Sequence, residues 1–258
     1  MNRFGDNLSV GPHGKRGEKA FDLIDWTPHA ALRMFRESET VNIYFDTKTD
    51  GIIFKDLNPI GLKNRGIASD AISMKTFPKM MQIHHDGYMM ELKDSLFKIT
   101  PVLSGVSPSL VIFAMTFKGL SRSETPRFIF SNETGTRSIS VRETTHTDAI
   151  LKIYSAGIEK EIVFDYTEWS GLFIQYKCEE GIVSCKYLLN DEHGTLSDGT
   201  EDKIPSDTLY IGGHPNKELA NHAMGSFEMY TLDQAEYLPD KMAKLLVNNI
   251  LKRVDSEN

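Results

Sequence analysis

The sequence predicts a mainly β protein, an antiparallel β-sandwich with one short helix near each end. Three observations point to this class. Short runs of β-branched and aromatic residues recur between positions 41 and 230, with Gly, Asn and Asp turns at the roughly 10-residue spacing typical of sandwiches. The run 110–117 is apolar at almost every position, which indicates a strand buried between two layers. Helical periodicity occurs only after Thr27 and after Pro239.

Length and composition fit one folded domain with short appendages. The chain has 258 residues, of which 40% are hydrophobic and 25% charged. Its 29 Lys and Arg against 36 Asp and Glu give a net charge of −7, so we expect no nucleic-acid partner. No apolar run approaches the roughly 18 residues of a membrane span, and we expect no membrane insertion. The first residues show no apolar segment of a cleavable signal peptide.

The first 40 residues form an N-terminal arm that begins with a collagen-like pattern. Gly11, Gly14 and Gly17 repeat with the period of three that a collagen triple helix requires. Three triplets cannot hold a triple helix alone. The arm is therefore either part of a trimer nucleated elsewhere or a polar tail in which the spacing is accidental.

A short helix is predicted in the second half of this arm. Thr27 suits an N-cap and Pro28 the first helical position, and Ala31, Leu32 and Phe35 share one face. We expect this helix to pack on the main domain. The alternative is a trimerising neck beside the glycine triplets.

Residues 41–238 are predicted to form the sandwich. The first two strands, 41–45 and 52–54, flank a turn that ends in Asp50-Gly51, which is a hairpin signal. Further strands are expected at 71–75, 81–84, 88–92, 110–117, 127–130, 138–142, 150–154, 161–164, two within 169–190, 208–213 and 225–230.

Residues 239–258 are predicted to form a C-terminal helix packed on the sandwich. Pro239 suits its start, and Lys252 and Arg253 lie at its end, where cations favour the helix dipole. One expected face consists of Met242, Leu245, Leu246, Asn249 and Ile250, and the other face carries Lys241, Lys244, Lys252 and Arg253.

Several motifs follow one another in a fixed order. Residues 87–96 have the pattern Gly-aromatic-x-x-x-Leu-x-Asp-x-Leu and precede the apolar strand 110–117. Trp169 precedes an alternating strand and its partner, Gly212 and Gly213 end a later strand, and Gly225 opens a Gly-x-Phe strand. Over residues 71–232 this order resembles the laminin-G-like, concanavalin A-like lectin sandwiches. The resemblance implies a jelly-roll fold that serves lectins, adhesion modules, pentraxins and glycosidases.

The glycosidase branch of that superfamily is similar to laminarinases, whose catalytic strand carries Glu-x-Asp-x-x-Glu or Glu-x-Asp-x-Glu. Such hydrolysis needs an acid and a nucleophile roughly 5 Å apart. The nearest candidates here are Glu159 with Glu161, and Asp165 with Glu168, and neither pair has a third carboxylate in register. No Gly-x-Ser-x-Gly elbow, Walker loop or dinucleotide fingerprint occurs either. We therefore expect a protein that is not an enzyme.

The resemblance also implies a possible calcium site, because many laminin-G-like and lectin domains hold calcium at a loop rim through oxygen ligands. Residues 190–207 contain six acidic residues and one lysine. Asp191, Asp198 and Asp202 are the candidate ligands. The alternative is an acidic loop that is simply solvated.

Histidines are weaker candidates. His84 and His85 precede a turn, and His214 and His222 flank the Gly-Gly loop, but no ligand spacing supports zinc. We expect surface histidines. The loop from Gly213 to Gly225 is a second candidate binding rim, beside the acidic loop.

The two cysteines and two sequons leave alternatives open. A two-residue turn at residues 180–181 would place Cys178 opposite Val183 and diagonal to Cys185, so a disulfide and two thiols are both compatible with the sequence. The sequons at Asn7 and Asn132 matter only in a secreted chain.

Together these features predict a recognition or adhesion module that binds a glycan or a protein receptor, such as a glycoprotein. In the first interpretation it is the head of a trimeric viral or phage attachment protein on a virion surface, where avidity multiplies weak affinity. The alternative is a fragment of a secreted, extracellular collagen-like protein. A polysaccharide hydrolase is the least favoured option.

Overall fold

The computed structural model describes residues 41–45, 51–84, 87–101, 110–120, 123–155, 157–179, 182–197, 208–232 and 236–254. The N-terminal arm, with its glycine triplets and expected helix, lies outside these residues. Within them, no helix is long and apolar enough to span a membrane.

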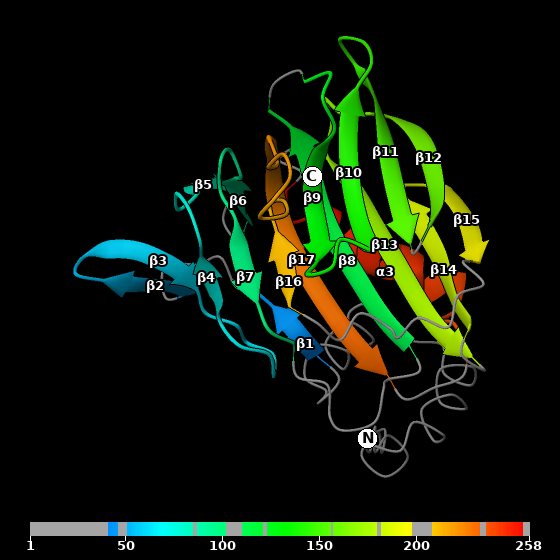
Figure 1. The fold of residues 1–258 in the computed structure, drawn as a ribbon, viewed down its shortest axis with the longest axis horizontal. Helices are drawn as coiled ribbons and strands as arrows, with labels where there is room; N and C mark the ends of the chain where they lie inside the picture. Colours follow the sequence, from blue (N-terminus) through cyan, green and yellow to red (C-terminus); the bar gives the residue numbers. More distant parts are fainter. Residues whose placement is uncertain are drawn as a thin grey trace, which may run out of the picture.

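The described strands form two antiparallel sheets, one of eight strands and one of nine, stacked face to face (Figure 1). The eight-stranded sheet runs in the order β15 (Glu192–Ser197), β14 (Ile182–Leu189), β13 (Ser170–Glu179), β8 (Leu110–Gly119), β17 (His222–Leu232), β6 (Gly87–Glu91) and β5 (Lys79–His84), with β1 (Val41–Tyr44) also paired to β17. The nine-stranded sheet runs in the order β12 (Ile158–Asp165), β11 (Asp148–Ser155), β10 (Arg137–Glu143), β9 (Arg127–Asn132), β16 (Leu209–Ile211), β7 (Phe97–Ile99), β4 (Ala71–Ser73), β3 (Asn58–Leu62) and β2 (Ile52–Lys55).

The main core lies between the sheets because alternate residues of each strand point inward. On β11 every second side chain is buried and the others are half-buried. Aromatic rings fill the centre. Phe113 of β8 lies 4.7 Å from Phe130, 5.9 Å from Tyr176 and 6.1 Å from Phe227, measured between ring centroids. These tilted and edge-on contacts join both sheets.

A second apolar layer covers the outer face of the eight-stranded sheet. Helix α3 (Asp240–Leu251) packs there on β8 and β13. The approach is close because β13 carries Gly171, where an added Cβ would lie 2.6 Å from a methyl group of Val247. The helix buries Met242, Ala243, Leu246, Val247 and Ile250.

Most of the predicted fold is confirmed: a mainly β antiparallel sandwich with a C-terminal helix packed on it. The predicted helix face is slightly rotated, because Ala243 and Val247 are fully buried while Leu245 and Asn249 are only half-buried.

The predicted hairpin between residues 41–45 and 52–54 is wrong. β1 pairs with β17, and β2 pairs with β3, so the two strands lie in different sheets. Three strands were missed. β3 contains Pro59 and Gly61, β7 has three residues, and β15 lies inside the segment expected to be an acidic loop.

We predict that Leu246→Ala lowers the free energy of unfolding by about 2–5 kcal/mol, because Leu246 is fully buried between α3 and the sheet. Urea denaturation followed by circular dichroism measures the change. Asn248→Ala on the exposed face of the same helix is the matched control and should stay within about 0.5 kcal/mol of the parent. Equal effects of the two substitutions would show that the helix is not docked.

Candidate functional site

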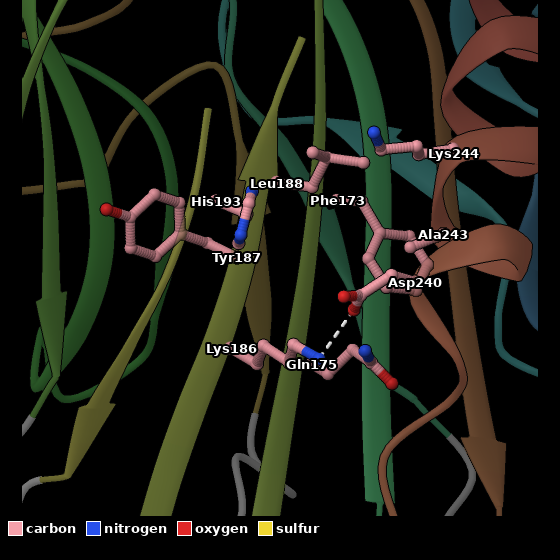
Figure 2. Close-up of a pocket in the computed structure, with 9 residues that line it drawn as sticks. All are labelled: Phe173, Gln175, Lys186, Tyr187, Leu188, His193, Asp240, Ala243 and Lys244. Carbon is pink, nitrogen blue, oxygen red and sulfur yellow. Dashed lines mark hydrogen bonds and ion pairs between the residues drawn. The ribbon is translucent and has the colours of Figure 1, made fainter. Parts of the chain in front are cut away.

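A pocket opens on the outer face of the eight-stranded sheet, between the first turns of α3 and strands β13, β14 and β15 (Figure 2). It encloses about 430 Å³, including the part open to solvent. Its lining residues are Phe173, Gln175, Lys186, Tyr187, Leu188, His193, Asp240, Ala243 and Lys244.

The wall formed by α3 is held in place by a buried amide. Gln175 on β13 is 1% exposed, and its side-chain oxygen accepts a hydrogen bond of 2.7 Å from the backbone N–H of Leu238. Its amide nitrogen donates to the carbonyl oxygen of the same residue over 3.3 Å. Both polar atoms of a buried side chain are thus satisfied, and the chain is fixed directly before the helix begins.

An ion pair bridges the pocket from the sheet to the helix (Figure 2). Lys186 Nζ on β14 lies 2.5 Å from Asp240 Oδ1 in the first turn of α3. The hydrogen bond from Lys186 is the main reason that the pKa of Asp240 lies below its ordinary value, and Lys186, His193 and Lys244 add a favourable charge effect. A carboxylate at this helix end also suits the dipole.

The floor is apolar and the rim is polar. Phe173, Leu188 and Ala243 are buried and form the base, while His193 and Lys244 are exposed at the rim. Tyr187 lines the pocket but its ring points away from the other labelled side chains in Figure 2, into the core between the sheets. Such a pocket offers several hydrogen-bond donors above an apolar base, with more positive than negative side chains.

The pocket does not contain the parts of a glycoside hydrolase. Among the residues that line it, Asp240 carries the only carboxylate, whereas hydrolysis by the usual mechanism requires two.

The carboxylates considered from the sequence lie on the nine-stranded sheet instead. Glu159 forms an ion pair with Lys152, and Glu161 lies opposite Lys152 in the β11–β12 register. Asp165 accepts hydrogen bonds from the hydroxyl and backbone N–H of Thr167, which lower its pKa. These contacts give the acids of β12 structural partners at the surface.

The structure places one of the three predicted calcium ligands. Asp191 lies exposed in the two-residue turn between β14 and β15, next to Asn190 at a φ of 51°. Asp198 and Asp202 lie outside the described residues. Within the described part of the chain, no group of three or more His, Cys, Asp or Glu residues could hold a metal ion.

Two histidines differ from the expectation of a surface position. His214 is 7% exposed, and its ring accepts a hydrogen bond from the backbone N–H of Asn216 and contacts the edge of Tyr210. His222 is fully buried at the start of β17. His214 is buried at the start of the loop that follows Gly213, whereas His222 is buried as the first residue of strand β17.

The environment of His222 keeps it neutral. The backbone N–H of Asn221 donates to Nδ1 over 3.2 Å, so the proton of the neutral ring is on Nε2, which lies 3.8 Å from Glu143 Oε1. Protonating Nδ1 would place two N–H groups against each other. Burial, followed by the charge of Arg127, lowers the pKa of His222 from 6.5 to about 4.

The predicted rim loop is shorter than expected, because β17 already begins at His222. Gly212 and Gly213 have φ values of 89° and 146°, and an added Cβ on Gly212 would lie 2.5 Å from the carbonyl oxygen of Ser95. Leu219 packs against Tyr210 below this loop. The paired glycines therefore have a structural role.

The cysteines and the internal sequon have the following positions. Cys178 lies opposite Val183 in the β13–β14 register, as predicted, and Cys185 is buried in the core. Asn132 is 3% exposed; its side chain donates to Thr134 and Thr136 and accepts from the backbone N–H of Arg137. This side chain closes the β9–β10 turn, which accounts for the Asn-Glu-Thr sequence.

The residues that form the pocket were missed by the sequence prediction. Lys186 and Asp240 are 54 positions apart, and only the docking of α3 brings them together. The one signal in the sequence that could have indicated this pocket was the set of polar positions on the C-terminal helix, because Lys244 is one of them and lines the pocket.

No protein-family model matches the chain, and no curated protein is similar enough in sequence to count as a match. Solved structures show the fold. The botulinum neurotoxin serotype D binding domain matches with a TM-score of 0.53 and 11% identity, over 85% of this chain and 52% of that one. Domain 4 of AbnA, an extracellular arabinanase of family GH43 from Geobacillus stearothermophilus, matches in its complex with arabinotriose with a TM-score of 0.52 and 12% identity, over 81% of this chain and 98% of that one.

These comparisons show that the chain shares the β-sandwich fold of these domains. The chain spans about half the length of the neurotoxin binding domains and nearly the whole arabinanase domain. The narrower laminin-G-like assignment stays a prediction.

We predict that acid destabilises this protein through His222. Between pH 6.5 and about 4 the unfolded chain binds a proton at His222 that the folded chain does not, so the free energy of unfolding falls as the pH falls. The loss across this window is about 3 kcal/mol. Urea denaturation at several pH values measures it.

The same series on His222→Gln should lack this part of the pH dependence, while His146→Gln, at an exposed position, should retain it. An identical decline in the parent and in His222→Gln would contradict the assignment.

Proposed function

We propose that the protein is a non-enzymatic recognition module that binds a saccharide in the pocket between α3 and strands β13–β15. The observation that carries this proposal is the composition of the pocket. Donors from Lys186, His193 and Lys244 surround an apolar floor, which matches a sugar with hydroxyl groups on its edge and C–H groups on its face. Few polar groups above an apolar base are typical of small-ligand sites.

The ligands found in similar structures support a binding role. The arabinanase domain was solved in complex with arabinotriose, and the binding domain of botulinum neurotoxin DC was solved in complex with SialylT. Cell entry of botulinum neurotoxin type C depends on interaction with two ganglioside molecules. The binding domain of botulinum neurotoxin DC was also solved in complex with rat synaptotagmin II. We propose a glycan or glycoprotein receptor as the partner of this chain, in an extracellular setting or on a virion surface.

The finer assembly is also proposed. Gly11, Gly14 and Gly17 support three copies joined through a collagen-like arm, with the sandwich as the head of a viral or phage attachment protein. The alternative is a piece of a secreted collagen-like matrix protein. Both arrangements gain avidity from three weak sites.

Calcium stays a proposal. Asp191 lies on the β14–β15 turn of the strand pair that lines the pocket, and oxygen ligands there would suit a hard cation. Isothermal titration with calcium, and with magnesium for comparison, tests it directly.

We predict that a glycan array with neutral and anionic sugars, including arabino-oligosaccharides, identifies a ligand for the full chain. His193→Ala/Lys244→Ala should then lower the affinity about tenfold or more, because two rim donors are lost. Both side chains are exposed, so folding should be unaffected. Repeating the assay with calcium and with chelator separates metal-dependent from direct binding.

His146→Ala/Lys160→Ala, a matched pair of exposed residues away from the pocket, is the control and should bind like the parent. Equal affinity of the pocket variant and the parent would move the saccharide site elsewhere. A blank array would contradict the saccharide proposal and favour a protein receptor.

A further inference from the structure

The part of the chain from Gly51 to Lys79 forms a wing at one edge of the sandwich. It contains β2, β3 and β4, the last strands of the nine-stranded sheet, and the loops that join them to β5. In Figure 1 the β2–β3 hairpin extends sideways beyond the stacked sheets. The proposed saccharide pocket lies at the opposite edge, beside β15.

Large apolar side chains are concentrated on this wing. Five of the eight exposed large hydrophobic residues of the described chain belong to it. They are Phe54, Leu57, Ile67, Ile72 and Met74. Leu57, at the tip of the hairpin, is 94% exposed, and Phe54, three positions before it, is 53% exposed. A concentration of exposed apolar side chains often marks a surface that contacts another molecule or a membrane. The tip of the hairpin is therefore suited to an apolar environment outside the protein.

The backbone at the tip is unusual for the residue that occupies it. Lys55 pairs with Asn58, which leaves Asp56 and Leu57 as a two-residue turn with φ values of 49° and 67°. Turns of this kind favour Asn and Gly. Every other described residue with positive φ is Gly, Asp or Asn, so Leu57 is the one apolar side chain held in this conformation.

The wing also has the opposite charge to the rest of the chain. It contains five basic and two acidic residues, although the whole chain has a net charge of −7. The basic residues are all exposed and consist of Lys55, Lys63, Arg65, Lys75 and Lys79. Asp70, one of the two acids, accepts a hydrogen bond from the backbone N–H of Asn64.

We propose that the wing docks on an anionic lipid surface, with Leu57 and Phe54 entering the interface and the basic side chains facing the headgroups. Apolar side chains at the tip can be buried among the lipid chains, and the cations around them are attracted to anionic headgroups. A second copy of this chain fits less well, since wing-to-wing contact would bring the same positive charges together.

This surface is separate from the proposed saccharide site and does not depend on it. It differs from the expectation of no membrane insertion, which considered spanning segments and amphipathic helices. A two-residue tip belongs to neither class.

The test is cosedimentation of the full chain with vesicles. We expect binding to vesicles of equal parts phosphatidylcholine and phosphatidylserine, and none to pure phosphatidylcholine. Leu57→Gly should lower the affinity about tenfold, because the inserted side chain is lost. Its thermal stability should stay the same or rise, because Gly suits a positive φ. Lys55→Gln/Lys63→Gln should also weaken binding, by about fivefold for each lysine near the surface.

Val163→Ser is the matched control, since Val163 is 66% exposed on β12 at the far edge of the same sheet. It should bind like the parent. Absence of binding to anionic vesicles at low salt would overturn the proposal, and so would equal losses from Leu57→Gly and Val163→Ser. Self-association in sedimentation velocity that Leu57→Gly abolishes, without vesicle binding, would assign the wing to a second copy instead.

Discussion

The burial of β8 on both of its faces is the constraint on which the rest of the structure depends. Val111, Phe113, Met115 and Phe117 point into the core between the sheets. Leu110, Ile112 and Ala114 point to the other side, where water would contact them if α3 were absent. A sandwich sheet with one solvated face would alternate apolar and polar residues, and this strand does not.

Helix α3 is therefore required by the sheet, and the pocket is a consequence of where the helix begins. The helix buries its apolar face over β8 and β13, and its first turn lies above β14, where the contact becomes polar. Gln175 fixes the chain before the helix, and the Lys186–Asp240 ion pair bridges the gap that remains. A site at the border between buried helix and exposed sheet combines an apolar floor with charged walls.

The sequence predicts those elements whose local pattern agrees with their environment. The run 110–117 indicated two-sided burial correctly, and the period of the last segment located α3. β3 and β15 were not predicted, because β3 contains Pro59 and β15 is mostly polar, and neither sequence is typical of a strand. Such segments become strands through pairing with a neighbouring strand, which the local sequence does not reveal. The 41–54 hairpin failed for the same reason. The Asp50-Gly51 sequence is typical of a hairpin turn, but the long-range pairing of β1 with β17 determines where β1 lies.

Side-chain sites are harder to predict, because they are made by tertiary contacts between distant positions. His222 shows this most clearly. Its neighbours in sequence suggest a loop, yet it is fully buried, beside Glu143 from another strand. Lys186 and Asp240 meet only because α3 docks. The acidic segment was judged by composition alone, and six of its 18 residues, Glu192–Ser197, form the edge strand β15.

Exceptions to local rules are informative where the rest of the chain obeys them. Glycines occupy the positive-φ positions at Gly212 and Gly213, and Asn190 and Asp94 occupy tolerated ones. Leu57 follows neither this backbone preference nor the tendency of apolar side chains to be buried. Two independent departures at one position favour an interaction with a partner outside the described residues, which is the role proposed here for the lipid surface. That reasoning separates Leu57 from Val163, which is exposed but has an ordinary strand backbone.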